Sequence, residues 1–327
     1  MTLLILIAFT VTAATLALLR RSALGRRMGD VPNERSLHVQ VVPRIGGIGI
    51  LAGLVAAWFA MPGAAPSLDR AAAGYLALFI ISIADDLRSL PVIVRLASHL
   101  LVAAAWFWAV GLSPWMLAIG VLTVAWSTNL YNFMDGSDGL AGGMAVFGFG
   151  TYAVAALQGN DMHTAMLCAS VAAAALAFLL FNFHPASLFL GDSGSVPLGF
   201  LAGVVGWHGI ATGLWPWSLP VLAFFPFLFD ASYTLLRRIL RAERPWQAHR
   251  EHLYQRAVRC GVGHRNVALG AYAIMTCTAV AGLVSIPSPE SLRAAVVALA
   301  SAAGLWIGVR IDRRLQHATQ GAGGPVR

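Results

Sequence analysis

Long apolar stretches that are almost free of charge recur along the whole chain, each about as long as a bilayer crossing. A spanning helix needs about 20 apolar residues, because the hydrocarbon core of a bilayer is about 30 Å thick. Only 11% of the residues are charged, against about 25% in a soluble domain, so a water-facing surface could not be covered. We therefore expect an all-α polytopic membrane protein with eleven spans. The predicted spans are residues 2–19, 45–62, 71–84, 92–111, 115–131, 141–157, 163–181, 195–211, 216–236, 266–286 and 291–310.

The distribution of arginine predicts the orientation of these spans. If the N-terminus is outside, 20 of the 22 basic residues lie on the inner side, and only Arg70 and Arg293 lie outside. Inner loops of membrane proteins are enriched in basic residues, so we expect an outer N-terminus and an inner C-terminus. The net charge of +8 is then a topology signal that also attracts anionic membrane lipid, and we expect no nucleic-acid partner. Residues 1–316 are predicted to form one membrane domain and 317–327 a disordered tail.

Acidic residues gather at the inner ends of the predicted spans. Asp85 and Asp86 end the third span, Asp135 and Asp138 follow the fifth, and Asp192 precedes the eighth. Carboxylates at a membrane boundary are costly unless they bind something cationic. Several carboxylates from different loops would suit Mg²⁺, which prefers oxygen ligands and accepts substrate phosphates. We therefore expect the three loops to meet in one site.

Each acidic motif also has a structural interpretation. The paired aspartates could end a helix beside Arg88, although two carboxylates are unfavourable at the negative end of the helix dipole. The Asp-Gly dipeptides at 135–136 and 138–139 could be ordinary turns, and the 191–195 run could be a turn capped by serine. Asp230, inside the ninth span, could equally be a buried acid bonded to nearby backbone or a functional residue.

The longest inner loop, residues 237–265, combines arginine with histidine. The orientation bias and attraction to lipid explain part of this charge. They do not explain why His249, Arg250 and His252 stand so close together, in a run that offers several donors to phosphate. We expect this loop to bind phosphate groups of a substrate.

Five segments together resemble one family, the polyprenyl-phosphate N-acetylhexosamine-1-phosphate transferases of glycosyltransferase family 4. These segments are Asp30–His38, Pro43–Gly47, Asp85–Asp86, Asn132–Gly139 and Phe189–Gly194. The resemblance implies transfer of a sugar 1-phosphate from a UDP-N-acetylhexosamine to undecaprenyl phosphate, with release of UMP. It also implies Mg²⁺, or Mn²⁺ in its place, and a site on the cytoplasmic face of a bacterial inner membrane.

The residues predicted to form this site fall into three groups. The predicted catalytic residues are Asp85, Asp86, Asp135 and Asp138. The predicted metal ligands are Asp192, Asp85 and Asn182. The predicted substrate-binding residues are Asn33, Arg35, His38, Arg44, Asn132, Asn182, Arg244, His249, Arg250 and His252.

The segment Arg244–Arg256 resembles the branch that initiates O-antigen synthesis, whose donors carry N-acetylated galactose, fucose or quinovose. The chain lacks the triple histidine of the peptidoglycan branch, and Tyr254 replaces the second histidine of the pair found in the enterobacterial-antigen and teichoic-acid branch. A member of either branch with a different UDP-sugar is the alternative. A transporter is a more distant one, because its acids should lie near the membrane midplane. The sequence leaves open whether the protein forms a homodimer.

Overall fold

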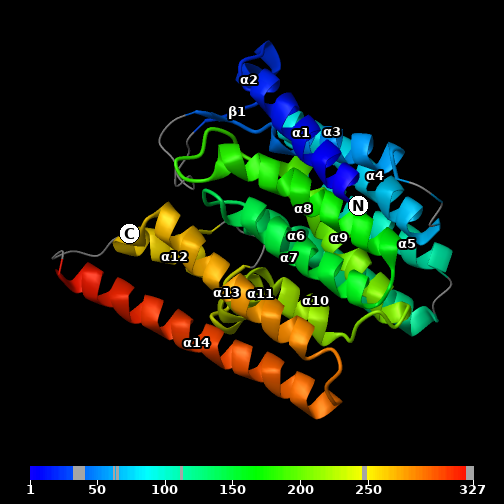
Figure 1. The fold of residues 1–327 in the computed structure, drawn as a ribbon. Helices are drawn as coiled ribbons and strands as arrows, with labels where there is room; N and C mark the ends of the chain where they lie inside the picture. Colours follow the sequence, from blue (N-terminus) through cyan, green and yellow to red (C-terminus); the bar gives the residue numbers. More distant parts are fainter. Residues whose placement is uncertain (32–40, 62, 64–65, 111–112, 245–248, 322–327) are drawn as a thin grey trace.

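The structure is a computed structural model that describes residues 1–31, 41–61, 63, 66–110, 113–244 and 249–321. Helices make up nearly all of it and run roughly along one common direction (Figure 1). The helices are α1 (Thr2–Leu19), α2 (Ala23–Arg27), α3 (Gly46–Phe59), α4 (Pro66–Arg88), α5 (Val92–Val110), α6 (Pro114–Phe133), α7 (Leu140–Gln158), α8 (Met162–Asn182), α9 (Asp192–Ala211), α10 (Ser218–Ala223), α11 (Phe225–Leu240), α12 (Leu253–Ala257), α13 (His264–Val284) and α14 (Glu290–Gly321), with a π-helical turn η1 (Val258–Val262) between α12 and α13.

Every predicted span coincides with a helix, and the ninth is broken into α10 and α11. The break lies at Phe224, next to Pro226, whose backbone lacks the N–H needed to continue a helix through this point. Seven helices of the described chain are long and apolar enough to cross a membrane, namely α1, α5, α7, α8, α9, α13 and α14. The protein is thus an all-α polytopic membrane protein, whereas eleven crossings and an outer N-terminus stay predictions.

Three details differ from the sequence expectations. Helix α4 extends beyond the predicted third span, so the paired aspartates lie in its last turn. Helix α14 continues to Gly321, five residues into the segment expected to be disordered, and no proline interrupts it earlier. Two short strands, β1 (Gly29–Asp30) and β2 (Val42–Pro43), form an antiparallel pair in an otherwise helical chain.

Helix α9 is buried along most of its length and packs closely against α3, α4 and α6. Small residues permit this approach, as is common between helices in membranes. A Cβ atom on Gly47 would lie 2.4 Å from the backbone nitrogen of Gly194, and one on Gly199 would lie 2.7 Å from the carbonyl oxygen of Ser127. The close crossings fix the start of α9, which carries Asp192.

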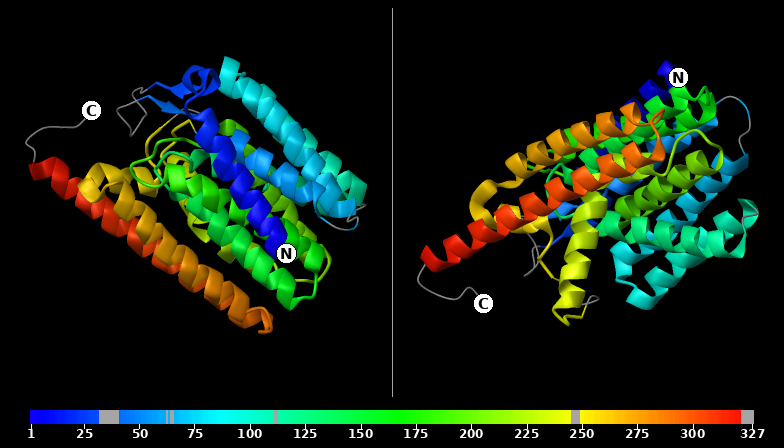
Figure 2. Two further views of the ribbon diagram at one scale, coloured as in Figure 1. Left: turned by 45° about the horizontal axis from the view of Figure 1, so that its top comes forward. Right: turned by 90° about the horizontal axis from the view of Figure 1, so that it is seen from below.

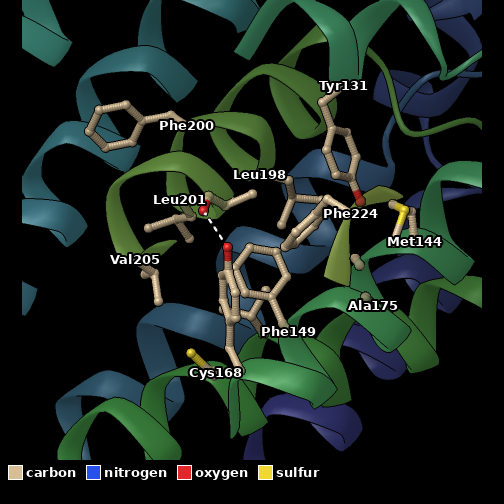
Figure 3. Close-up of a cluster of buried hydrophobic side chains, with 14 of the residues drawn as sticks. Tyr131, Met144, Phe149, Cys168, Ala175, Leu198, Phe200, Leu201, Val205 and Phe224 are labelled. Carbon is tan, nitrogen blue, oxygen red and sulfur yellow. Dashed lines mark hydrogen bonds between the residues drawn. The ribbon is translucent and has the colours of Figure 1, made fainter. Parts of the chain in front are cut away.

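An aromatic cluster fills the centre of the bundle (Figure 3). The Tyr152 ring on α7 stacks on Trp215 with ring centroids 5.0 Å apart, and its hydroxyl donates to the carbonyl of Ala202 on α9. The Tyr131 hydroxyl on α6 donates to the carbonyl of Ala141 on α7. Both buried hydroxyls are therefore satisfied, as an apolar environment requires, and they tie α6 and α9 to α7.

A large apolar cavity lies between α11, α13 and α14; α13 and α14 run side by side along one flank of the molecule, and α11 crosses them steeply (Figures 1 and 2). Its volume is ≈ 700 Å³, and its lining includes Leu222, Phe229, Ile274 and Leu299. One end of the cavity reaches Met134, in the loop that precedes Asp135. Apolar packing between α14 and the rest of the bundle is consequently sparse.

Candidate functional site

The backbone segment from Pro43 to Gly47 lies beside the segment that leads into α9. The N–H of Phe189 donates to the carbonyl of Pro43, and the N–H groups of Gly46 and Gly47 donate to the carbonyls of Phe189 and Leu190, all at 2.9 Å. The segment that leads into α3 is thereby fixed against the start of α9. This pairing brings Arg44, which follows β2, to the same end of the bundle as Asp192.

Asp86 caps the N-terminus of α9 from the last turn of α4. Its Oδ1 accepts from the N–H of Asp192 and its Oδ2 from the N–H of Ser193, both at 3.0 Å. The preceding Gly191 has φ +75°, and a Cβ there would lie 3.0 Å from Asp86 Oδ2, so glycine is required. The carboxylate satisfies two N–H groups that a helix start leaves unpaired and lies at the positive end of the dipole.

The neighbouring Asp85 has a different environment. The side-chain nitrogen Nη1 of Arg95 lies 3.1 Å from Oδ2 of Asp85 and 3.5 Å from Oδ2 of Asp192. The carboxyl groups of Asp85 and Asp192 are within hydrogen-bonding range of each other, and the Asn132 side chain bonds to Asp192. Arg95 was not among the residues predicted for the site, although it lies only ten positions after Asp85 on the next helix.

Asp135 lies in the loop between α6 and α7 and is partly buried. Burial raises the pKa of this carboxyl well above its ordinary value, and the nearby negative charge of Asp192 raises it further. Arg44 acts in the opposite direction and also forms an ion pair with Asp30. We call these residues the carboxylate cluster: Asp30, Arg44, Asp85, Asp86, Arg95, Asn132, Asp135 and Asp192.

Asp138 lies outside the carboxylate cluster and pairs with a histidine that the sequence analysis did not select. Its Oδ2 is 2.6 Å from Nδ1 of His184. The His184 ring is stacked on His264, with centroids 5.7 Å apart, and the Ser137 hydroxyl lies 2.9 Å from Nδ1 of His264. The second aspartate of the motif thus organises a neighbouring histidine pair.

Asn182 is buried at the end of α8 and uses both ends of its amide within the protein. Its Oδ1 accepts from the N–H of Gly139 at 3.0 Å, and its Nδ2 donates to the carbonyl of Leu188 at 2.9 Å. The side chain therefore joins the loop after α6 to the loop before α9. This geometry gives Asn182 a structural role, and its expected metal-binding role stays a prediction.

Asp230 on α11 is a structural acid. Its carboxylate accepts from the N–H groups of Leu253 at 2.8 Å and Tyr254 at 3.1 Å, and it lies 3.3 Å from Nδ1 of His252. Of the two interpretations that the sequence left open, the structure favours a buried acid bonded to nearby backbone. It holds the start of α12 in place.

The part of the predicted phosphate-binding loop that lies between α11 and α12, residues 241–252, is called the donor loop. Tyr254, which follows it in α12, contacts the segment beside the carboxylate cluster. The Tyr254 hydroxyl donates to the carbonyl of Phe133 at 3.1 Å, close to Asp135. A Cβ on Gly136 would lie 2.2 Å from this hydroxyl, so only glycine fits beneath it. The aromatic residue that replaces histidine in the motif therefore supports the loop that carries Asp135.

Three of the loop side chains predicted to bind phosphate are at least partly exposed, whereas His252 is buried. His249 and Arg250 are partly exposed, and Arg244 is exposed while its carbonyl accepts from Arg238. Burial, followed by the positive charges of His252 and Arg238, lowers the pKa of His249 to about 4. The predicted residues Asn33, Arg35 and His38 lie outside the described residues.

The chemistry of the carboxylate cluster fits a hard divalent cation. Within the described part of the chain, no three acidic, histidine or cysteine side chains are already arranged as a metal site. The carboxyl groups of Asp85 and Asp192 nevertheless lie within hydrogen-bonding range of each other, and the repulsion between two such charges is relieved either by a shared proton or by a bound cation. Arg95 now supplies the nearest positive charge, and oxygen donors of this kind are those that Mg²⁺ prefers.

Comparison with known proteins gives the same picture. The sequence model of glycosyl transferase family 4 matches residues 70–209, which include Asp85 and Asp192. A probable undecaprenyl-phosphate N-acetylglucosaminyl 1-phosphate transferase of Bacillus subtilis is 30% identical over 292 residues, covering 83% of this chain and 82% of the relative. An undecaprenyl-phosphate alpha-N-acetylglucosaminyl 1-phosphate transferase of Yersinia pestis is 27% identical over 302 residues, covering 83% and 79%.

A phospho-N-acetylmuramoyl-pentapeptide-transferase of Geobacillus thermodenitrificans is 41% identical over a shorter stretch of 92 residues, covering 28% of this chain and 26% of the relative. These matches, with the apolar helices described above, make the chain a multi-pass protein of the bacterial inner membrane. The extent of the similarity, and the order in which the motifs occur, lead to one conclusion. The chain belongs to glycosyl transferase family 4, as a polyprenyl-phosphate N-acetylhexosamine-1-phosphate transferase.

Proposed function

We propose that this enzyme transfers an N-acetylhexosamine 1-phosphate from a UDP-sugar to undecaprenyl phosphate and releases UMP. The observation that carries the proposal is the carboxylate cluster, in which acids from three loops meet Arg44 and Arg95 at one end of the bundle. Two polyanionic substrates must meet in this reaction, so neutralisation of charge is the first requirement. The cluster offers both positive side chains and carboxylates for a bridging cation.

Mg²⁺ is part of the proposal, and Mn²⁺ could replace it. Asp85 and Asp192 would hold the ion, with Asn132 close to Asp192. When bound, the ion would supply charge neutralisation for the pyrophosphate and for the departing UMP. Asn182 stays among the proposed ligands, because its amide oxygen has a second lone pair besides the one that accepts from the N–H of Gly139.

The side chains of the site then have separable tasks. Asp86 fixes the first turn of α9, so that Asp192 keeps its position. Arg44 and Arg95 can bind phosphate oxygens, as can His249 and Arg250 of the donor loop. A phosphate monoester has a second pKa near 6, so the acceptor phosphate is largely dianionic at neutral pH and needs no strong base.

In the transfer itself, an oxygen of the acceptor phosphate forms a bond to the sugar-linked phosphorus of the donor. The bond from that phosphorus to the oxygen bridging to UMP breaks, and UMP leaves with the electron pair. Asp135 can donate a hydrogen bond to a phosphate oxygen when its carboxyl group is protonated. Its raised pKa widens the pH range over which the carboxyl group is protonated. Asp85 is placed to orient the acceptor beside Arg95.

Two observations bear on the sugar. The names of the Bacillus and Yersinia relatives support UDP-N-acetylglucosamine as the donor to test first. The segment Arg244–Arg256 supports O-antigen initiation and its N-acetylgalactosamine and 6-deoxy donors. We keep O-antigen initiation as the proposed pathway, with peptidoglycan or teichoic-acid synthesis as the alternative.

The test uses the purified full-length enzyme in lipid, undecaprenyl phosphate, Mg²⁺ and a radiolabelled UDP-sugar. Label should move into the organic-soluble lipid with equimolar release of UMP. Competition among UDP-N-acetylglucosamine, UDP-N-acetylgalactosamine and a 6-deoxy donor identifies the preferred sugar. Absence of labelled lipid with all three donors would refute the proposed reaction.

A further inference from the structure

Asp312, near the inner end of α14, lies between two arginines from two other helices. Arg237 on α11 places Nη1 at 3.0 and 3.2 Å from the two carboxylate oxygens of Asp312. Arg256 on α12 contacts the same carboxylate through Nη2. One carboxylate on the last helix therefore joins the two helices that flank the donor loop.

The approach of α14 to these helices depends on a small residue. Gly304, Gly308 and Asp312 follow each other at intervals of four and so share one face of the helix. A Cβ on Gly304 would lie 2.7 Å from the ring of Phe229 on α11. A Cβ on Gly308 would make an ordinary contact with Leu253 of α12 at 3.5 Å, so the close approach depends on Gly304. The face of α14 that packs against α11 and α12 therefore ends at the carboxylate of Asp312.

Arg256 depends on this carboxylate more than Arg237 does. Its side chain is only 7% exposed, against 24% for Arg237. Its Nη1 has no hydrogen-bond partner among the described residues. A buried guanidinium that loses its partner is strongly unfavourable. Without Asp312, Arg256 would have to move toward water, and α12 would move with it.

A displacement of α12 would reach the donor loop directly. The helix has only five residues, too few to be stable by itself, so its position depends on contacts at its two ends. Asp230 holds the first end and Asp312 holds the second. His252 and Tyr254, at the start of α12, contact the loops that carry Phe133 and Asp135.

We propose that Asp312 is a positioning residue for the donor: by pairing with Arg237 and Arg256 it holds α12 in place and so keeps His249 and Arg250, which shortly precede α12, in position to bind the UDP-sugar. This inference rests on the proposed function for its kinetic consequence. The residue acts through Arg256 and does not touch the substrates. It also gives the last helix, which the cavity separates from much of the bundle, a role in the reaction.

The kinetic test compares Asp312→Asn with Glu290→Gln, which removes an ion pair with Arg293 at the other end of the same helix. Asp312→Asn should raise the KM for the UDP-sugar by about tenfold, a typical size for coupling between contacting charged groups. The kcat and the KM for undecaprenyl phosphate should change by less than about threefold. Glu290→Gln should leave all three values near wild type, and Asp312→Glu should restore most of the donor affinity.

A double variant tests whether the effect runs through Arg256. Combining Asp312→Asn with Arg256→Gln removes the charge that the first change leaves unpaired. The two effects on the donor KM should therefore be non-additive, with the double variant no worse than Asp312→Asn alone. Additive effects, an unchanged KM in Asp312→Asn, or an equal effect of Glu290→Gln would each overturn the proposal.

A measurement without turnover separates this proposal from the proposed function. Cys260 in η1 lies 3.9 Å from the carbonyl of Ile311 and is partly buried beside α14. In a Cys277→Ala background, where Cys168 is buried, a maleimide should label Cys260 several times faster in Asp312→Asn than in Glu290→Gln. Equal labelling rates would refute the proposed positioning role of Asp312 even if the enzyme is active. Failure of wild type to transfer any sugar would refute only the proposed function.

Discussion

Replacing Asp86 by asparagine tests the cap that α4 provides for α9. Asparagine keeps one acceptor oxygen but presents an amide nitrogen, which donates and cannot accept, in place of the other. One of the two N–H groups, of Asp192 or Ser193, would therefore lose its partner. Since Ser193 is fully buried, water cannot replace the lost bond.

The size of the effect follows from these contacts. A buried donor left unsatisfied costs about 1–3 kcal/mol, and the lost charge at a helix N-terminus removes about 0.3–1 kcal/mol. We expect Asp86→Asn to lower the free energy of unfolding by about 2 kcal/mol, or the apparent Tm by about 3 °C in a chain of this length. Because Asp192 is the first residue of α9, a shift of about 1 Å there should lower kcat by about 100-fold.

The matched control is Asp161→Asn. Asp161 caps α8 in the same way, accepting from the N–H and the hydroxyl of Thr164 at 3.0 and 2.7 Å, at the opposite end of the bundle. Thermal unfolding in detergent and the radiolabel assay should show a similar loss of Tm in both variants but a loss of transfer in Asp86→Asn alone. If both variants keep normal turnover, the cap serves stability only and the reasoning fails.

Three further predictions follow from the site and the orientation. Asp192→Asn should abolish transfer at ordinary Mg²⁺, because it removes charge while keeping shape, and near-normal turnover would exclude it as a main ligand. Between pH 6.5 and about 4, His249 binds more protons in the unfolded chain than in the native protein. The apparent Tm should therefore fall with acidification, and less steeply in His249→Gln; parallel curves would contradict this. A reporter fused after Arg327 should be cytoplasmic and one at Asp161 periplasmic, whereas the reverse would overturn the orientation.

The helical segments could be predicted because hydropathy alone decides whether a stretch can enter a bilayer. The proximity of Asp85, Asp86 and Asp192 could be predicted because carboxylates from separate predicted inner loops can bind one cation only if they lie close together. The division of roles between Asp85 and Asp86 could not. It depends on which of the two faces the first turn of α9, and that is a matter of helix packing.

Other parts of the site depend on contacts between distant segments. The sequence placed Asp138 with the other acids, but its partner His184 comes from the loop after α8. Arg95 was counted as a topology signal, and only the packing of α5 beside α4 shows that it lies between two carboxylates. Tyr254 departs from the family motif, and its support of the Asp135 loop follows from a hydroxyl that reaches Phe133.

The cavity between α11, α13 and α14 has a consequence for handling the protein. An empty apolar space of ≈ 700 Å³ would be very unfavourable, so we expect hydrocarbon from the surrounding lipid to fill this volume in the bilayer. Delipidation would leave the same volume to detergent tails, whose length and packing differ. The thermal stability and turnover of the purified enzyme should therefore depend on acyl-chain length, and re-adding lipid should restore what a short-chain detergent removes.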